Sequence, residues 1–213
     1  MEEGEYCGIN FYSSTIYFNC FNYWRCFELK KLILILLFAC IQINAQKHFT
    51  KYDDTFKKYS KRFFGIGYDW KIFKAQSIAE SGLNPDAVSF AGARGLMQLM
   101  PSTFAEIQST NSFLENIDDP TWNIAAGIYY DRQLYKAWKD IDTEDEKFRF
   151  TFGSYNAGRG TILKAQGKAK DKNLDHTTWE SITVVAPEVP KWRHEETLGY
   201  VEKIKKFHLE LMK

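Results

Sequence analysis

The sequence predicts a mainly α-helical protein with a single folded domain. The 213-residue chain is 45% hydrophobic, which suits one ordinary domain with a real core. Apolar residues recur at helical spacing along several segments, and short loops containing Gly, Pro or Asn separate these segments. Strand signals are weak, because "ITVVAP" at residues 182–187 is the only short β-branched run.

The first helix is expected over "DWKIFKAQSIAES", residues 69–81. Asp69 is a plausible N-cap for it, because an aspartate side chain can accept hydrogen bonds from the first free N–H groups. Gly82 suits a left-handed C-terminal cap, and Pro85 prevents continuation. The stripe of apolar residues at helical spacing consists of Ile72, Phe73, Ala75, Ile78 and Ala79.

Four further helices follow the same reasoning. One should start near Ser102, behind a proline, and the next should follow "DDP" and carry a broad apolar face over 122–138. Residues 144–158, "EDEKFRFTFGSYNAG", have acidic side chains in the first turn, where the helix dipole favours them, and end in a glycine. The last helix should run from about Glu195 with one apolar face.

The N-terminal segment "KKLILILLFACIQINAQ" has the layout of an export signal. Two lysines precede an apolar run that is too short to span a membrane, and the small residue Ala45 stands before Gln46. We therefore expect residues 30–45 to be a signal peptide, residues 46–213 to be the exported domain, and its location to be the periplasm or cell envelope. A retained membrane anchor and lipid attachment at Cys40 are the alternatives.

Residues 1–29 fit neither a signal peptide nor a domain, so we interpret them as an uncertain N-terminal extension. A start-site error would explain them, with an alternative start at Leu29. All cysteines of the sequence precede the expected cleavage point, which excludes disulfides, thiol chemistry and cysteine-based zinc sites from residues 46–213; they are Cys7, Cys20, Cys26 and Cys40.

Charge and histidine spacing exclude other classes of function. Lys and Arg total 28 and Asp and Glu total 27, so the net charge of +1 gives no field that attracts nucleic acid. The four histidines share no metal-ligand spacing. We therefore expect no metal, no cofactor and no nucleic-acid partner, and a monomer.

Glu80 is the candidate catalytic residue, because it falls in the last turn of the first predicted helix. The negative end of the helix dipole and any burial both disfavour another negative charge there and would raise its pKa. A carboxylic acid that stays protonated near neutral pH can donate a proton to a glycosidic oxygen. From position alone, an ordinary exposed acid near a helix end is the competing interpretation.

Four blocks in fixed order resemble the goose-type lysozyme and soluble lytic transglycosylase family, which includes catalytic domains like that of membrane-bound lytic murein transglycosylase F. The blocks are "ESGLNPDAVSFAGARGLMQLMPST" from Glu80, "NIAAGIYYDRQL" at 123–134, "SYNAG" at 154–158 and "ETLGYV" at 196–201. The resemblance implies a lysozyme-like fold and a single catalytic domain. One departure is Gly153-Ser154, where the family more often has Ala-Ala or Leu-Ala, and we interpret it as a change in packing.

The resemblance also implies roles for individual residues. Glu80 corresponds to the catalytic acid, which later acts as a base. Gly92 and Gly95 would let the backbone approach a glycan, and Thr197 belongs to the C-terminal block that closes the site. The substrate-binding positions around the acid are Ser81, Ser89, Met97, Gln98, Met100, Tyr155, Asn156, Glu196 and Tyr200.

A lone acid suffices if the substrate supplies the nucleophile, whereas ordinary glycosidases use two carboxylates. The resemblance implies a peptidoglycan lytic transglycosylase that cleaves the β-1,4 bond between N-acetylmuramic acid and N-acetylglucosamine and forms a 1,6-anhydro product. A lysozyme-like hydrolase and a weakly active glycan-binding cell-wall module are the alternatives. Trp179 and Trp192 are candidates for stacking on sugars, while Trp70, Trp122 and Trp138 fall on predicted core faces.

Overall fold

The computed structural model describes Lys31 and residues 50–213, and Tyr52–Lys213 form one compact unit. The expected extension at 1–29, the signal peptide at 30–45 and Cys40 lie outside the described residues, apart from Lys31. Within the described part, none of the helices combines the length and the apolar character needed to cross a bilayer.

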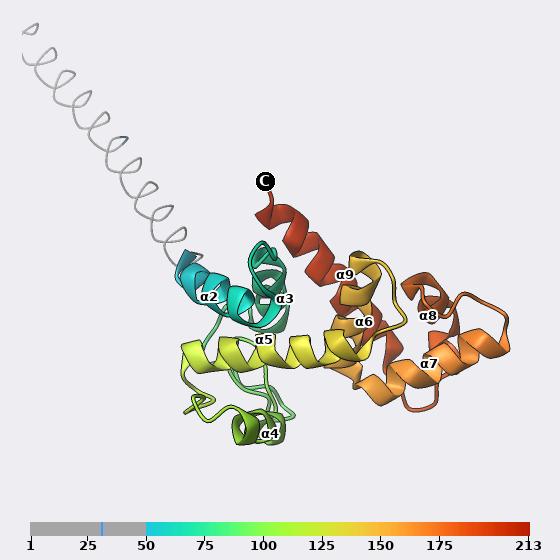
Figure 1. Ribbon diagram of the computed structural model, residues 1–213, viewed down its shortest axis with the longest axis horizontal. Helices are drawn as coiled ribbons and strands as arrows, with labels where there is room; N and C mark the ends of the chain where they lie inside the picture. The colour runs from blue at the N-terminus through green and yellow to red at the C-terminus, as the bar shows by residue number, and fades with distance from the viewer. Residues whose placement is uncertain (1–30, 32–49) are drawn as a thin grey trace, which may run out of the picture. The chain divides into compact units, whose positions relative to one another are not determined.

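The described part of the chain is helical, which confirms the mainly α prediction. Its β pairing is limited to isolated bridges that join Val88 to Arg94 and Arg94 to Leu99. Figure 1 shows α5 running through the middle of the unit, with α2 and α3 on one side and α4 on the other. The helices are α2 (Asp53–Phe64), α3 (Lys71–Ser81), α4 (Pro101–Thr110), α5 (Pro120–Ala137), α6 (Glu144–Ala157), α7 (Arg159–Asp171), α8 (Trp179–Val185), the 3-10 helix η1 (Ala186–Glu188) and α9 (His194–Leu211).

The ends of α3 follow from its sequence, with one correction at its start. Trp70, not Asp69, occupies the N-cap position, although Asp69 Oδ1 does accept a hydrogen bond of 3.0 Å from the Lys71 N–H. Gly82 adopts the left-handed conformation, with φ 64° and ψ 29°, and its N–H closes the helix on the Ile78 carbonyl. The first predicted helix therefore ends where its glycine indicated.

Capping side chains also explain where α5 and α6 begin. Asp119 Oδ1 accepts hydrogen bonds from the backbone N–H groups of Thr121 and Trp122, at 2.7 and 3.1 Å, and Pro120 occupies the first helical position. The Thr143 side chain accepts from the Glu146 N–H at the start of α6. The starts of α4 and α9 lie within one residue of their predicted positions.

Among the described residues, three α-helices and one 3-10 helix have no counterpart in the sequence prediction: α2, α7, α8 and η1. The β-branched run at 182–187 is helical, because it falls in α8 and η1. Ile182 and Val185 are three residues apart on one face of α8, and both are completely buried. Burial against the rest of the core outweighs the β preference of this run.

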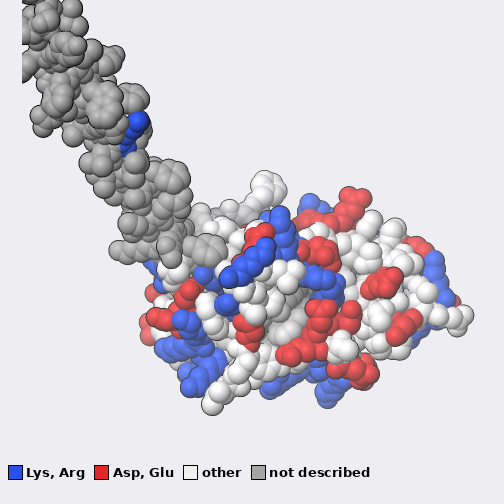
Figure 2. Space-filling model, turned by 90° about the horizontal axis from the view of Figure 1, so that it is seen from above, with Lys and Arg blue, Asp and Glu red and all other residues white. Residues whose placement is uncertain are grey.

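Packing in the core fixes the position of α3, which contacts both α2 and α9. Aromatic side chains from α2, α3 and α6 meet at Phe64, Phe73 and Phe148, with ring centroids 4.8–6.0 Å apart. α5 buries residues 123–128 together with Asp131 and Leu134. Most charged side chains lie on the surface, apart from the buried Lys74 and Asp131. Figure 2 shows basic and acidic side chains interspersed on the face of the molecule in view.

Gly153 on α6 creates the space for Trp179 on α8. The Trp179 side chain is 3% exposed and packs edge-on against Phe150, with ring centroids 5.5 Å apart. A Cβ atom at Gly153 would lie 2.2 Å from Cη2 of the Trp179 ring. The glycine that departs from the family pattern is thus a packing requirement of this core.

We expect Gly153→Ala to lower the free energy of unfolding by about 1–3 kcal/mol, because the Trp179 ring must move and overpacking has this cost. Gly167→Ala on α7 is the matched control, since no atom lies within 4 Å of its Cβ position. The control should stabilise by up to about 1 kcal/mol through helix propensity. Thermal and urea unfolding measure both, and equal stabilisation by the two variants would contradict the packing role.

Candidate active site

Glu80 lies in the last turn of α3 and contacts α9. Its Oε1 accepts a hydrogen bond of 2.6 Å from the Tyr200 hydroxyl, and the Tyr200 side chain is itself buried. Lys203, one turn further along α9, reaches the carbonyl of Ala79 at 3.5 Å. The first and last helices of the site therefore meet at this carboxyl group.

The environment of Glu80 favours its protonated form. Burial raises its pKa from 4.5 to about 7, while the hydrogen bond from Tyr200 and the positive charge of Lys203 act in the opposite direction. A carboxyl group with a pKa near 7 can donate a proton and take it back at neutral pH. The pKa of Glu80 is therefore raised, as its position in the sequence predicted, and burial is the main cause.

The loop between α3 and α4, residues 82–100, is attached to α3 through its own backbone. The hydroxyls of Ser77 and Ser81 both donate to the Leu96 carbonyl, at 3.0 and 2.9 Å. The Tyr155 hydroxyl of α6 donates to the Met97 carbonyl at 2.8 Å. Ser81 and Tyr155, both predicted to bind substrate, therefore use their hydroxyls to hold this loop beside Glu80.

Asn123 of α5 holds the same loop from below. Its amide nitrogen donates to the carbonyls of Arg94 and Ile117, both at 2.9 Å, and its Oδ1 accepts from the Met97 N–H at 2.8 Å. A Cβ atom at Gly95 would lie 2.4 Å from this amide. The absence of a side chain at Gly95 thus makes room for Asn123. That Gly95 also lets the backbone approach a glycan stays a prediction.

Gln98 and Ser89 also form bonds within the loop. Gln98 has a positive φ of 45°, and its Nε2 donates to the carbonyls of Ala87 and Gly95 at 3.1 and 2.9 Å. Ser89 Oγ accepts from the Ala93 N–H at 2.9 Å. Both residues were predicted to bind substrate. Because Gln98 Nε2 donates to the loop backbone, Oε1 is the amide atom that remains to accept a hydrogen bond from a ligand.

The prediction that the Met97 side chain binds substrate is wrong. This side chain is completely buried and occupies the space that Gly127 leaves open on α5. Met100 is 40% exposed, so its side chain is accessible to a ligand, in agreement with its predicted place. The two methionines of the "LMQLM" block thus have different roles, one in the core and one on the surface.

The remaining predicted residues, Asn156 and Glu196, lie at a pocket between the end of α6 and the start of α9. Trp192 Nε1 donates to Thr197 Oγ1 at 2.9 Å, and Thr197 donates to Asn156 Oδ1 at 2.7 Å. Asn156 and Glu196 line this pocket, whose volume is about 230 Å³. Trp192 forms part of its wall, whereas Trp179 is buried in the core, so stacking of Trp179 on a sugar is excluded.

The sequence analysis did not identify Phe90, which is fully exposed on the loop that follows Glu80. Val88, two residues earlier, is 67% exposed. Together with Met100 they give the loop an apolar outer surface. An aromatic residue inside a Gly-rich loop, with no helical or strand periodicity around it, is the signal that could have identified this surface.

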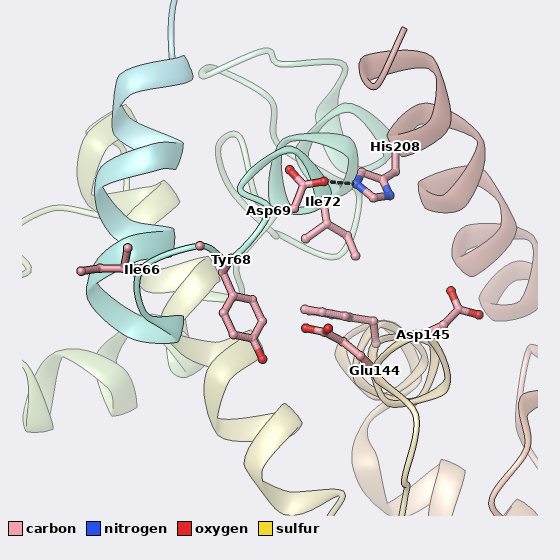
Figure 3. Close-up of a pocket in the computed structure, with 9 residues that line it drawn as sticks. Ile66, Tyr68, Asp69, Ile72, Glu144, Asp145 and His208 are labelled. Atoms are coloured by element: carbon pink, nitrogen blue, oxygen red, sulfur yellow. Dashed lines mark hydrogen bonds and ion pairs between the residues drawn. The ribbon is translucent and has the colours of Figure 1, made fainter.

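A larger cavity of about 570 Å³ lies at the opposite end of α3 from Glu80, about 15 Å along the helix. Figure 3 shows Asp69 facing His208 there, with their Oδ2 and Nε2 atoms 2.6 Å apart, and Glu144 and Asp145 approaching from α6. Within Lys31 and residues 50–213, no three His, Cys, Asp or Glu side chains are arranged to hold a metal ion.

The fold and the site define a class: a helical domain with one desolvated carboxylic acid at a helix end, beside a Gly-rich loop fixed by surrounding helices. A family model described as "Transglycosylase SLT domain" matches residues 56–177, more than half of the chain. This chain belongs to the SLT transglycosylase domain family.

Relatives and solved structures agree with this assignment. The chain is 36% identical over 121 residues to membrane-bound lytic murein transglycosylase F of Desulfosudis oleivorans, a match that covers 57% of this chain and 26% of the relative. The protein of the same name from Photobacterium profundum is 28% identical over 173 residues, with 76% and 32% covered. This chain therefore spans about a quarter to a third of these curated relatives.

The crystal structure of the 70 kDa soluble lytic transglycosylase SLT70 from Escherichia coli is similar to 74% of this chain and matches 23% of its own length. The TM-score is 0.57 and the sequence identity is 26%. The similarity confirms the prediction of a lysozyme-like fold.

The raised pKa of Glu80 predicts a pH-dependent stability. The folded state binds the proton of Glu80 more tightly than the unfolded state, so the free energy of unfolding should fall as pH rises from 4.5 to about 7. Glu80→Gln removes this titration. The variant should be more stable than the parent protein above pH 7, by about 1–3 kcal/mol, and the difference should vanish near pH 4.5.

Urea unfolding at a series of pH values measures this difference, with Glu115→Gln, an exposed loop position, as the control. This control makes the same replacement of a carboxyl group by an amide away from the site. A stability difference that grows as the pH falls would contradict the raised pKa of Glu80.

Proposed function

We propose that this chain is a lytic transglycosylase that cleaves the β-1,4 bond between N-acetylmuramic acid and N-acetylglucosamine in peptidoglycan and forms a 1,6-anhydro-muramyl product. The observation that carries the proposal is Glu80, a single acid with a pKa of about 7, bonded to Tyr200. The names of the relatives, which are lytic murein transglycosylases, support it.

In the first step, protonated Glu80 donates its proton to the glycosidic oxygen while the bond from that oxygen to C1 of N-acetylmuramic acid breaks. The bonding electrons leave with the oxygen, so the departing sugar carries a free hydroxyl. The 2-acetamido oxygen of the substrate stabilises the positive charge at C1. The Tyr200 hydroxyl donates to the carboxylate that Glu80 has become.

In the second step, the Glu80 carboxylate accepts the proton of the 6-hydroxyl group of N-acetylmuramic acid. The oxygen of that hydroxyl forms a bond to C1 and closes the 1,6-anhydro ring. Glu80 is again protonated, and no water, metal or cofactor takes part. The burial of Glu80 favours this return of the proton, because the ionised form is the one that burial penalises.

Two surfaces of the described residues suit glycan binding. The exposed side chains of Phe90 and Met100 offer an apolar surface on the loop beside Glu80. The pocket with Asn156 and Glu196 offers polar groups at the ends of α6 and α9. A sugar ring has both apolar and polar surface, so it suits both kinds of contact.

The arrangement favours transglycosylation over hydrolysis. A hydrolase on this fold would need a second carboxylate that holds a water molecule opposite Glu80. Asp131 is a carboxyl group whose charge would act on the site, and it is completely buried, without access to solvent water. Since Glu80 is intact, a role limited to glycan binding is the weaker alternative.

Glu80→Gln should lower the release of muropeptides from purified peptidoglycan by about 100-fold or more, because the amide cannot act as general acid. Its circular dichroism spectrum should be unchanged, and Glu115→Gln should retain parental activity. Mass spectrometry of the products decides the reaction: anhydro products are lighter than hydrolysed ones by one water molecule. Hydrolysed products would support the lysozyme alternative, and near-parental activity of Glu80→Gln would contradict the role of Glu80.

The proposed location is the cell envelope, in agreement with the names of the membrane-bound relatives. Export would follow from the signal-like segment at 30–45. N-terminal sequencing of protein recovered from a bacterial host should give a start at Gln46. A start at a lipid-modified Cys40 would replace a soluble exported domain by a lipid-anchored one.

A further inference from the structure

Asp131 and Gln76 form a buried pair directly behind the catalytic acid. Asp131 lies on α5 and Gln76 on α3, and both side chains are 0% exposed. Gln76 Nε2 donates to Asp131 Oδ1 at 3.2 Å. Because Gln76 precedes Glu80 by four residues, the two lie on the same face of α3, one turn apart.

The other polar atom of each side chain, Asp131 Oδ2 and Gln76 Oε1, is buried without a hydrogen-bond partner among the described residues. Both atoms would be acceptors if Asp131 were ionised. A buried carboxylate with a single neutral donor would carry a large desolvation cost in that state.

One proton on Asp131 Oδ2 removes this cost. The protonated oxygen becomes a donor, and the unpartnered Oε1 of Gln76, on the side chain already bonded to Asp131, is an acceptor. The acid and the amide would then share two hydrogen bonds in a ring, one in each direction. The same proton removes the buried charge.

The surroundings of Asp131 also favour the neutral acid. The titratable groups that act on it or feel its charge come from four helices: Glu80 of α3, Tyr130 of α5, Tyr155 of α6 and Tyr200 of α9. All four are neutral or negative, so none stabilises an anion at Asp131 through opposite charge. Burial and the nearby Glu80 carboxyl raise the pKa of Asp131 well above its usual range.

We propose that Asp131 is a neutral acid, held in a two-hydrogen-bond ring with Gln76, and that this ring is a positioning unit for Glu80. The ring joins α5 to the turn of α3 below the catalytic acid and fixes the orientation of that turn. It also keeps the space behind Glu80 uncharged, so that Glu80 alone ionises during the reaction. The positioning role rests on the proposed function, whereas the neutral state of Asp131 does not.

The protonation state is tested by carbon NMR of protein produced from the full chain with labelled aspartate carboxyl groups. The Asp131 signal is the one that disappears in Asp131→Asn. It should keep the shift of a protonated acid over the pH range in which exposed aspartates are ionised, as a buried carboxyl group with a strongly raised pKa does. A signal of an ionised carboxylate in this range would overturn the proposal, whether or not the protein cleaves peptidoglycan.

The positioning role is tested by comparing Asp131→Asn with Asp131→Leu. Asparagine can replace the acid in the ring, because its amide group also offers one donor and one acceptor to Gln76. Asp131→Asn should therefore keep kcat within about two-fold, while Asp131→Leu should lower kcat by about tenfold or more at unchanged KM, as misplaced catalytic groups do.

Equal kcat values for the two variants, per folded molecule, would overturn the positioning role. The positioning role is overturned whether both variants keep the parental kcat or both lose it equally, because asparagine offers Gln76 the same two hydrogen bonds. If Asp131→Leu does not fold, the NMR titration still decides the protonation state of Asp131. The kcat of Asp131→Asn then tests the positioning role, and a loss of more than about two-fold contradicts it. Without any activity in the parent protein, the proposed function fails, and the titration alone decides the state of Asp131.

Discussion

The hydrogen bond from the Tyr200 hydroxyl to Glu80 is the interaction on which the site depends. It joins residues 120 positions apart, so the site is incomplete until α9 has packed against α3. Burial alone would favour a permanently protonated acid, and full exposure would favour a permanently ionised one. The combination of burial with a neutral donor, Tyr200, and a nearby cation, Lys203, keeps the pKa of Glu80 near 7, between these limits.

The loop at residues 82–100 extends this dependence to the middle helices. It lacks regular secondary structure, yet Ser77 and Ser81 of α3, Asn123 of α5 and Tyr155 of α6 all bond to its backbone. Its position relative to Glu80 is therefore set by the packing of three helices. A core substitution that shifts any of them changes the proposed site without replacing a residue of that site.

Local signals predicted those parts of the molecule that local chemistry determines. Gly82 and Asp119 end and begin their helices as their sequence contexts indicate. By contrast, α7 starts directly after Gly158 without a capping side chain, and the β-branched α8 is helical because of its tertiary burial. The position of Glu80 at a helix end predicted a raised pKa, but its main cause is burial in the tertiary structure. The inward orientation of Met97 depends on space left by Gly127, a residue on another helix that no local pattern connects to it.

The bonds that fix the loop end on carbonyl and amide groups of the main chain, and this has a consequence for how such a domain can evolve. Exposed side chains at Val88, Phe90 and Met100 take no part in these bonds. Mutation at these positions can therefore change the outer surface while the path of the backbone is preserved. Selection for a different glycan or cell wall could act on the surface of this loop independently of selection for folding.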